Sequence, residues 1–455
     1  LDLHSILSSE SSALTHPSYP NHHVRFKQTH GFCDETVKTY TGYIDIEHGR
    51  KHLFFYFFES RRDPDNDDVV SCINGGPGGG SSALGLLTEL GPCNIDSSSP
   101  NGTAWNPWGW NRKTNLLFLD QPIDVGYSYG DKTPLPSTAP DAARDVHAFL
   151  TVWFETFSKF KGRPFHFAGD SYGGRYVPVF ASHIWDRNQD AHEEGRTPIN
   201  LQSIMLGNGW TNPAKIYGSY YDMLCKNSTI TPFYPIRMCS ELVYTAPECE
   251  KKITQSCGRN YNKFDCRAAF DYCQTELINS FETTSINWYD ISKSCGGNDL
   301  DCYPEIEEVR KYLSKNSTKD MLGVPRNHKF QVISWPLHEA FVDAGDMYDP
   351  SDSYVVGLLE RGVRVLVYVG TNDLACNFVG NYRTVQGLDW SGSNAFTSSE
   401  LTPWSVNGHV AGETKSHGRL TFATIRGAGH LVPFDKPEES VYMLEKWVAN
   451  EHLGD

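Results

Sequence analysis

The sequence predicts an α/β protein with a mostly parallel central sheet, flanking helices and one large insertion. Apolar runs rich in β-branched residues alternate with helical patterns through the first half of the chain, and similar patterns return near its C-terminus. Between these stretches, eight of the 12 cysteines lie from Cys225 to Cys302, where the alternation is absent. Alternating strands and helices form parallel sheets covered by helices, so the cysteine-rich part is expected to interrupt one sheet domain.

The first half of the chain shows the pattern element by element. Three β-rich runs separated by turn residues, at 39–46, 53–58 and 69–73, indicate an antiparallel start to the sheet. The alternating elements that follow are strands at 115–120, 165–168 and 203–206 and helices at 141–157 and 174–185.

The pattern breaks from about residue 213 to residue 333 and then returns. The runs 363–369 and 420–425 are continuously apolar, as in strands buried on both faces. An amphipathic helix is expected over 437–450, with these residues facing inward: Val441, Leu444, Trp447 and Val448. We therefore predict three segments: 1–212 and 334–455 as the two parts of the core, and 213–333 as an inserted cysteine-rich lid subdomain.

Charge and hydropathy exclude several classes of partner. With 40 Lys+Arg against 55 Asp+Glu, the formal net charge is −15, so we expect no broad cationic surface for nucleic acid. No apolar run approaches the roughly 20 residues of a membrane span, and none is predicted. The chain begins at Leu1 without an apolar leader, which suits a mature form after leader removal, although a truncated chain would look the same.

The cysteines favour disulfides over metal. None forms a Cys-x-x-Cys pair and no paired histidines accompany them, which argues against zinc. Disulfides form in the oxidising secretory pathway. Three Asn-x-Ser/Thr sites, at Asn101, Asn227 and Asn316, are predicted N-glycosylation sites, and N-glycosylation occurs in the same pathway. We therefore expect a protein of the secretory pathway, either secreted or vacuolar/lysosomal, that needs no metal or organic cofactor.

A candidate nucleophile lies between a predicted strand and a predicted helix. Gly169-Asp170-Ser171-Tyr172-Gly173 has the form Gly-x-Ser-x-Gly, in which the serine occupies a sharp turn that leaves no room for neighbouring side chains. The start of the following helix favours negative charge developing at that serine. Ser171 is therefore the predicted nucleophile.

A serine hydroxyl needs a base, and the base needs an orienting acid. Asp373 follows the predicted strand 363–369, and His430 follows the predicted strand 420–425 in a glycine-rich loop. The chain order Ser171, Asp373, His430 is that of α/β-hydrolases, which is the fold we predict. Other histidines lie mostly in polar loops, so His430 is the predicted base.

The glycine-rich stretch 74–80 follows the early strand 69–73, where this fold places one oxyanion donor. We predict the N–H groups of Gly76 and of Tyr172 as the two donors. A phosphate-binding loop is not expected, because no Gly-Lys-Ser/Thr follows the glycines.

Several motifs are spread over nearly the whole chain. They are Asn74-Gly75-Gly76-Pro77-Gly78, Glu89-Leu90-Gly91-Pro92, Trp110-Asn111, Leu119-Asp120-Gln121-Pro122, Gly169-Asp170-Ser171-Tyr172-Gly173, Asp373 with Cys376-Asn377, and Gly429-His430 with Val432-Pro433. Together they resemble the serine carboxypeptidase family, in its carboxypeptidase Y-like, fungal form. The resemblance implies a serine-type carboxypeptidase that hydrolyses the last bond of peptides and proteins, through an acyl-enzyme, at acidic pH.

The resemblance also implies a clamp for the free α-carboxylate of the substrate. Its residues are the Asn74 side chain, the Gly75 N–H and an acid pair, Glu89 and Asp170, that shares a proton. Two neighbouring carboxyls do not both ionise at mildly acidic pH, so one can donate a hydrogen bond to the substrate. The family usually has Glu where this chain has Asp170, one methylene shorter, which leaves the spacing of the pair open.

The disulfides are also implied by the resemblance, since sequence alone allows many pairings. Within the insertion they are Cys225–Cys239, Cys249–Cys273, Cys257–Cys266 and Cys295–Cys302. Both cysteines of another family bridge are absent, whereas Cys33 and Cys93 are additional, and we predict that these two pair. Cys72 and Cys376 are left unassigned, and the bridges are expected to keep ordered an insertion with little continuous apolar patterning.

Other functions use the same triad. An acyltransferase or esterase is the alternative, and a non-catalytic binding protein on the same scaffold is a further one. The carboxylate clamp favours the carboxypeptidase. The preferred side chains of the substrate, the oligomeric state and the choice between vacuole and exterior stay open.

Overall fold

The computed structural model describes residues 12–16, 19–226, 232, 234–257, 262–278, 285–295 and 302–454. The chain divides into two compact units. The first unit comprises Leu1–Gly169, Val179–Ile204 and Glu305–Phe341, and the second comprises Asp170–Pro178, Met205–Pro304 and Val342–Asp455. This division by compactness differs from the three segments expected from sequence, and the inserted lid stays a prediction.

The first unit is built on a sheet with the strand order β1-β2-β3-β4-β8-β5-β10. The strands are β1 (Ser12–His16), β2 (Tyr19–Thr29), β3 (Thr39–Ile46), β4 (Lys51–Phe58), β5 (Val69–Ile73), β8 (Asn115–Leu119) and β10 (Phe165–Asp170). Pairing is antiparallel from β1 to β8, and β5 is parallel to both β8 and β10. The predicted antiparallel start is therefore confirmed.

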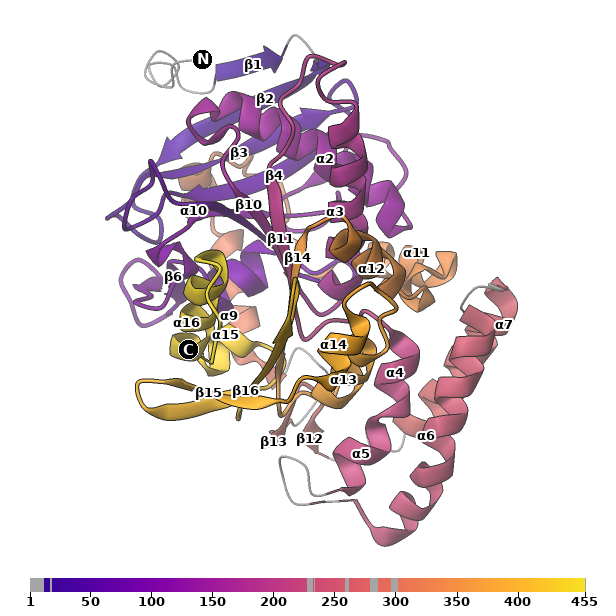
Figure 1. The fold of residues 1–455 in the computed structure, drawn as a ribbon. Coiled ribbons are helices and arrows are strands. Elements are labelled where there is room, and N and C mark those ends of the chain that lie inside the picture. Colours follow the sequence, from indigo (N-terminus) through magenta and orange to yellow (C-terminus); the bar gives the residue numbers. More distant parts are fainter. Residues whose placement is uncertain are drawn as a thin grey trace. The chain divides into compact units, whose positions relative to one another are not determined.

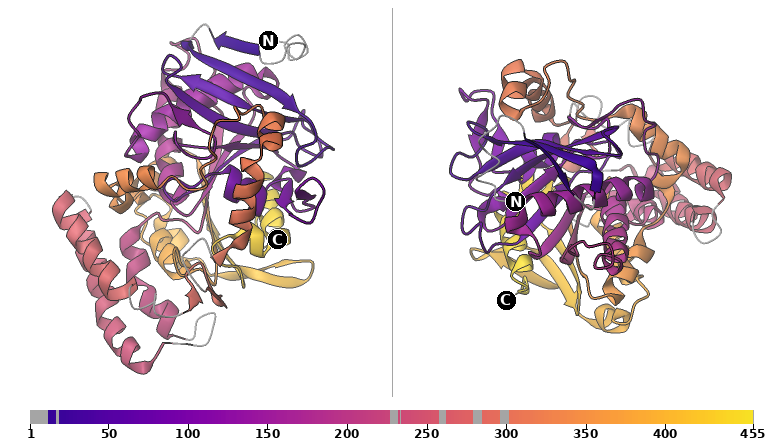
Figure 2. Two further views of the ribbon diagram at one scale, coloured as in Figure 1. Left: turned by 180° about the vertical axis from the view of Figure 1, so that it is seen from behind. Right: turned by 90° about the horizontal axis from the view of Figure 1, so that it is seen from above.

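Helix α2 (Ala139–Thr156) covers strands of this sheet (Figures 1 and 2). It begins where the Thr138 side chain accepts a hydrogen bond from the Asp141 N–H, which satisfies an otherwise unpaired first-turn donor. Trp153 of α2 packs edge-on against Phe57 of β4, with ring centroids 4.8 Å apart. Aromatic burial of this kind fixes the helix on the sheet.

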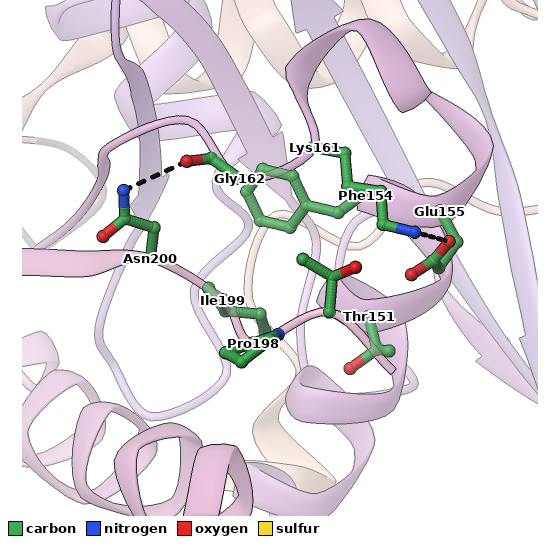
Figure 3. Close-up of a pocket in the computed structure, with 9 residues that line it drawn as sticks. Thr151, Phe154, Glu155, Lys161, Gly162, Pro198, Ile199 and Asn200 are labelled. Carbon is green, nitrogen blue, oxygen red and sulfur yellow. Dashed lines mark hydrogen bonds and ion pairs between the residues drawn. The ribbon is translucent and has the colours of Figure 1, made fainter. Parts of the chain in front are cut away.

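A small pocket of the first unit lies between α2, the turn 161–162 that comes after it, and the segment 197–200 that follows α3 (Gly173–Gln189) (Figure 3). Lys161 donates to Glu155 at 2.6 Å and Asn200 donates to the Gly162 carbonyl at 3.0 Å along its wall. None of the predicted site residues lines it.

The second unit holds the later strands, in the order β11-β14-β17-β16-β15. They are β11 (Leu201–Gly207), which begins in the first unit, β14 (Arg364–Gly370), β15 (Thr402–Val406), β16 (His409–His417) and β17 (Leu420–Ile425). β14 and β17 are parallel, with Gly370 opposite Ile425, so the loops after both strands leave the same edge. The hairpin β15–β16 was not predicted.

The last helix, α16 (Pro437–Val448), matches the predicted amphipathic helix. Val441, Leu444 and Trp447 are buried as expected. Val448 is only half-buried, whereas Met443 and Ser440 are buried, because the buried face of α16 centres on Ser440, Leu444 and Trp447.

The cysteine-rich part is mainly helical. Its described elements are α4 (Pro213–Gly218), α5 (Tyr220–Cys225), α6 (Ile236–Cys257), α7 (Lys263–Cys273) and the strands β12 (Ile286–Asn287) and β13 (Asp290–Ser294). α6 and α7 lie side by side (Figure 2). The buried face of α6 is formed by Leu242, Ala246, Cys249, Ile253 and Cys257. The expectation of little apolar patterning is therefore wrong, since buried cysteines complete a helical stripe.

All five predicted disulfides are present: Cys33–Cys93, Cys225–Cys239, Cys249–Cys273, Cys257–Cys266 and Cys295–Cys302. Cys72 and Cys376 are buried thiols. Among the described helices, none combines the length and apolar character that crossing a bilayer would take.

Candidate active site

Ser171 occupies a strained turn between β10 and α3. Its φ of 58° is in the left-handed region, which is unusual for a residue other than glycine. The turn packs closely on the end of β11: the Ser171 N–H donates to the Gly207 carbonyl at 3.0 Å, and a Cβ on Gly174 would lie 2.5 Å from the Trp210 nitrogen. Glycine at 174 is therefore required for the approach that holds Ser171 at the edge.

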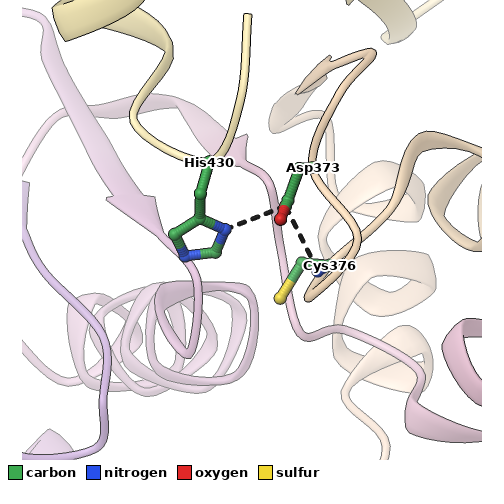
Figure 4. A group of neighbouring side chains, drawn as sticks. All are labelled: Asp373, Cys376 and His430. Carbon is green, nitrogen blue, oxygen red and sulfur yellow. Dashed lines mark hydrogen bonds and ion pairs between the residues drawn. The ribbon is translucent and has the colours of Figure 1, made fainter. Parts of the chain in front are cut away.

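Asp373 lies in the loop after β14 and His430 in the loop after β17, as predicted, and the two side chains are in contact. His430 Nδ1 lies 2.8 Å from Asp373 Oδ2 (Figure 4). The same oxygen accepts hydrogen bonds from Asn208 Nδ2 at 2.7 Å and from the Cys376 N–H at 3.1 Å. Both side chains are buried, Asp373 completely. Three donors on one carboxylate oxygen fix the orientation of Asp373 and of the imidazole bound to it.

The charge environment favours proton uptake by His430. Burial alone would lower the pKa of His430, but the charge and hydrogen bond of Asp373 and the charge of Asp170 outweigh it and raise the pKa above its ordinary value. An imidazole with a raised pKa and a fixed Nδ1 partner is suited to accept a proton at Nε2.

Cys376 connects Ser171 with the aspartate–histidine pair. Burial and the charges of Asp373 and Asp170 raise the pKa of the Cys376 thiol well above its ordinary value, opposed by a hydrogen bond with the Ser171 side chain. Ligand atoms of Asp373, Cys376 and His430 lie within 4.8 Å of one another (Figure 4). Asp373, Cys376 and His430 thus form one buried cluster.

Sequence reasoning missed Asn208, which orients Asp373. The side-chain oxygen of Asn208 accepts a hydrogen bond from the Gly370 N–H at 3.2 Å, and the backbone N–H of Asn208 donates to the Tyr368 carbonyl at 2.9 Å. The signal was present, because Gly207-Asn208-Gly209 follows a predicted parallel strand, at the edge where site residues gather.

Sequence reasoning also missed Asp346, which binds two residues that follow Ser171. Tyr172 donates its hydroxyl to Asp346 Oδ2 at 2.5 Å, and Arg175 Nη2 donates to Asp346 Oδ1 at 2.9 Å. Arg175 also binds Asp349, at 2.6 Å. Burial alone would lower the pKa of Arg175, but Asp346 and its neighbours raise it, so the guanidinium stays charged. This buried ion pair fixes the residue that follows Ser171.

We expect Tyr172→Phe to lower the free energy of unfolding by about 1.5–3 kcal/mol, because it removes a hydrogen bond to a buried carboxylate. Urea denaturation followed by tryptophan fluorescence measures the change. Tyr442→Phe on α16 is the control, with an expected change within about 0.5 kcal/mol. Equal stability of Tyr172→Phe and the wild type would contradict the role of this hydroxyl.

Of the remaining predicted residues, Asn74, Gly75, Gly76 and Glu89 lie in the first unit, whereas Asp170, the last residue of β10, belongs to the second. Asn74 follows β5, donates from Nδ2 to Glu89 Oε1 at 3.1 Å, and accepts at Oδ1 from the Gly85 N–H at 2.9 Å. Glu89, the last residue of a π-helix over Ser82–Glu89, is buried. The Gly75 carbonyl accepts from the Gly79 N–H at 2.9 Å, and Gly76 has a φ of 111° before a cis peptide bond to Pro77. The loop is thus tightly folded around Asn74.

The sequence of this chain is similar to those of known carboxypeptidases. A family model described as serine carboxypeptidase matches residues 30–450. Carboxypeptidase Y of Candida albicans is 37% identical over 440 residues, which cover 96% of this chain and 78% of that protein. Carboxypeptidase Y homolog A of Paracoccidioides brasiliensis is 39% identical over 423 residues, covering 92% and 74% respectively.

A solved structure shows the same fold. A prohormone-processing carboxypeptidase of Saccharomyces cerevisiae superposes with a TM-score of 0.76 at 23% identity and covers 92% of both chains. The predicted α/β-hydrolase fold is confirmed. Because the family model spans nearly the whole chain and relatives of more than 30% identity cover most of it, the chain belongs to the serine carboxypeptidase family.

Proposed function

We propose that Ser171, His430 and Asp373 are the catalytic triad of this serine carboxypeptidase, acting on peptides and proteins with a free α-carboxylate. The observation that carries the proposal is the 2.8 Å contact of His430 Nδ1 with Asp373, which leaves Nε2 for Ser171. Ser171 supports it by its strained position at the start of a helix. The relatives' names describe carboxypeptidases, so an acyltransferase or esterase is not favoured.

In the proposed reaction, His430 Nε2 takes the Ser171 Oγ proton as the oxygen attacks the last peptide carbonyl. The N–H groups of Gly76 and Tyr172 stabilise the oxyanion. His430 then gives its proton to the leaving amine, which departs as a free amino acid. Water, deprotonated by His430, attacks the acyl-enzyme, and His430 returns the proton to Ser171 Oγ as the shortened peptide is released.

We further propose that Asn74, the Gly75 N–H, Glu89 and Asp170 bind the terminal carboxylate. Within the first unit, the Asn74–Glu89 hydrogen bond supports the proposal, because it brings a side-chain amide and a buried carboxyl together at the start of the loop after β5. A carboxyl that stays protonated at acidic pH donates to the substrate, whereas two ionised carboxyls repel it.

The clamp predicts a pH-dependent KM for peptides. Between about pH 4.5 and about pH 7.5 we expect the KM of an N-blocked dipeptide to rise at least about tenfold, since ionisation of the shared proton repels the substrate carboxylate. The KM of a simple ester, which lacks that charge, is expected to stay within about threefold. A peptide KM that does not change with pH would contradict the clamp.

The secretory pathway is the proposed location, secreted or vacuolar. Five disulfides support it, because such bonds persist in oxidising compartments. Asn101 and Asn316 are exposed and can accept N-linked glycans, while Asn227 lies outside the described residues.

A further inference from the structure

The strands β12 and β13 form a short hairpin within the cysteine-rich part of the second unit. Asn287 Oδ1 accepts from the Tyr289 N–H at 2.8 Å, and Asp290 Oδ1 accepts from the Ser292 N–H at 3.0 Å and from its hydroxyl at 2.6 Å. Cys295, which directly follows β13, is bonded to Cys302. The Asn287 and Asp290 side chains close a compact turn at 288–289, and we call this turn together with the start of β13 the 288–293 turn.

The 288–293 turn binds the loop that carries Asp373. The Ile291 N–H donates to the Asn372 carbonyl at 2.9 Å, and Asn372 Nδ2 donates to the Ser292 hydroxyl at 3.2 Å. On the other side of Asp373, the Leu374 N–H donates to the Trp288 carbonyl at 3.3 Å. Asp373 is therefore held between two contacts with the same turn.

The same turn binds the loop that carries His430. The His430 N–H donates to the Tyr289 carbonyl at 2.7 Å. A Cβ on Gly429 would lie 2.5 Å from that carbonyl and 2.7 Å from the Asp290 Cβ, so only glycine permits the approach. One turn of the cysteine-rich part thus contacts the backbone on both sides of the Asp373–His430 hydrogen bond.

Lys293 links this turn to the His430 loop by charge. Its ammonium lies 2.9 Å from Asp290 Oδ2 and 2.6 Å from Asp435 Oδ1. The other oxygen of Asp435 accepts from the Gly429 N–H at 2.8 Å. Both carboxylates are buried, with side-chain exposures of 1% and 7%, whereas Lys293 is about half exposed.

A cation between two buried carboxylates is required to keep them together. Burial alone would lower the pKa of Lys293, but hydrogen bonds and charges from Asp435 and Asp290 raise it, so the ammonium stays charged. Without it the carboxylates repel each other, and Asp435 loses its fixed position against the Gly429 N–H.

We propose that Lys293 is a positioning residue for His430: through Asp435 it fixes the backbone at Gly429, and through Asp290 it joins that backbone to the turn that holds Asp373. This rests on the proposed catalytic role of His430. The cysteine-rich part then helps to align the acid–base pair in addition to its predicted role as a lid.

The test is the rate at which a small organophosphonate labels Ser171, which reports nucleophile activation without a peptide pocket. We expect Lys293→Met to lower the second-order rate constant by about 10- to 100-fold, as displacement of a catalytic group by about 1 Å does. The ester kcat should fall in parallel while the ester KM stays within about twofold. Lys293→Arg should restore most of the rate.

The matched control is Lys226→Met, which removes another half-exposed lysine of the cysteine-rich part from its ion pair with Asp222. It should label at the wild-type rate. Asp435→Asn, which keeps an acceptor for Gly429 but loses the charge that holds Lys293, is the second variant and should lower the rate in the same direction.

Wild-type labelling rates in folded Lys293→Met and Asp435→Asn, whatever their melting temperatures, would overturn the positioning role. If Lys293→Met does not fold, Asp435→Asn decides. A wild-type protein that is not labelled at Ser171 would overturn the proposed function and this inference with it, so the two failures are distinct.

Discussion

Replacing Asp373 with alanine is expected to lower kcat by about 10⁴-fold, as loss of the orienting acid does in serine proteases. The geometry explains the size of the effect. Asp373 is fully buried, and its Oδ2 is the partner of His430 Nδ1 at 2.8 Å. Without it, the imidazole loses both its fixed tautomer and the charge that stabilises the imidazolium. A loss of less than about tenfold would contradict the assignment of Asp373.

Asp373→Asn separates these two contributions. Asn208 Nδ2 and the Cys376 N–H both point at Oδ2, so they select the amide oxygen for that place and keep the hydrogen bond from His430. The charge is lost, however, and it is one of the groups that raise the pKa of His430. Since His430 acts when neutral, a lower pKa moves the acidic limb of kcat/KM to lower pH. An acidic limb that does not move, or one at higher pH, would contradict this account.

Replacing Ser171 with alanine is expected to lower kcat by about 10⁶-fold and to abolish labelling by an organophosphonate. The nucleophile has no substitute, because the neighbouring Cys376 thiol is kept protonated by burial and by two carboxylates. Mass spectrometry of the labelled peptide identifies the residue. Undiminished turnover by Ser171→Ala, or a label on another serine, would contradict its role.

Ser171→Gly provides the matched stability control. The φ of 58° at residue 171 suits glycine and strains alanine, so the glycine variant should be equally inactive but more stable than Ser171→Ala by about 1 kcal/mol. Thermal unfolding of the two variants compares them under the same conditions.

The sequence predicted those site residues that lie directly after a strand. The strands before Asp373 and His430 were predicted almost to the residue, and parallel pairing brings their ends to one edge. Ser171 was recognisable because its turn has local requirements for glycine. Such signals need only the residues next to one another in the chain.

The groups that support the site were not predictable in the same way. Asp346 binds Tyr172 and Arg175 across more than 170 positions, and nothing near Asp346 in the sequence indicates a buried ion pair. In the sequence Lys293 looks like an ordinary surface lysine, and only the structure shows its ion pair with Asp435. These contacts depend on the packing of distant segments, which the pattern of a single sequence does not contain.

The most direct test of the central claim compares an N-blocked dipeptide with its C-terminal amide at mildly acidic pH, with Ser171→Ala as the control. Rapid release of the last residue from the free acid, slow or no release from the amide, and no release by Ser171→Ala are predicted for an exopeptidase that binds the terminal carboxylate. If neither peptide is cleaved while simple esters are hydrolysed, the carboxylate clamp and the carboxypeptidase mechanism proposed for this chain are wrong.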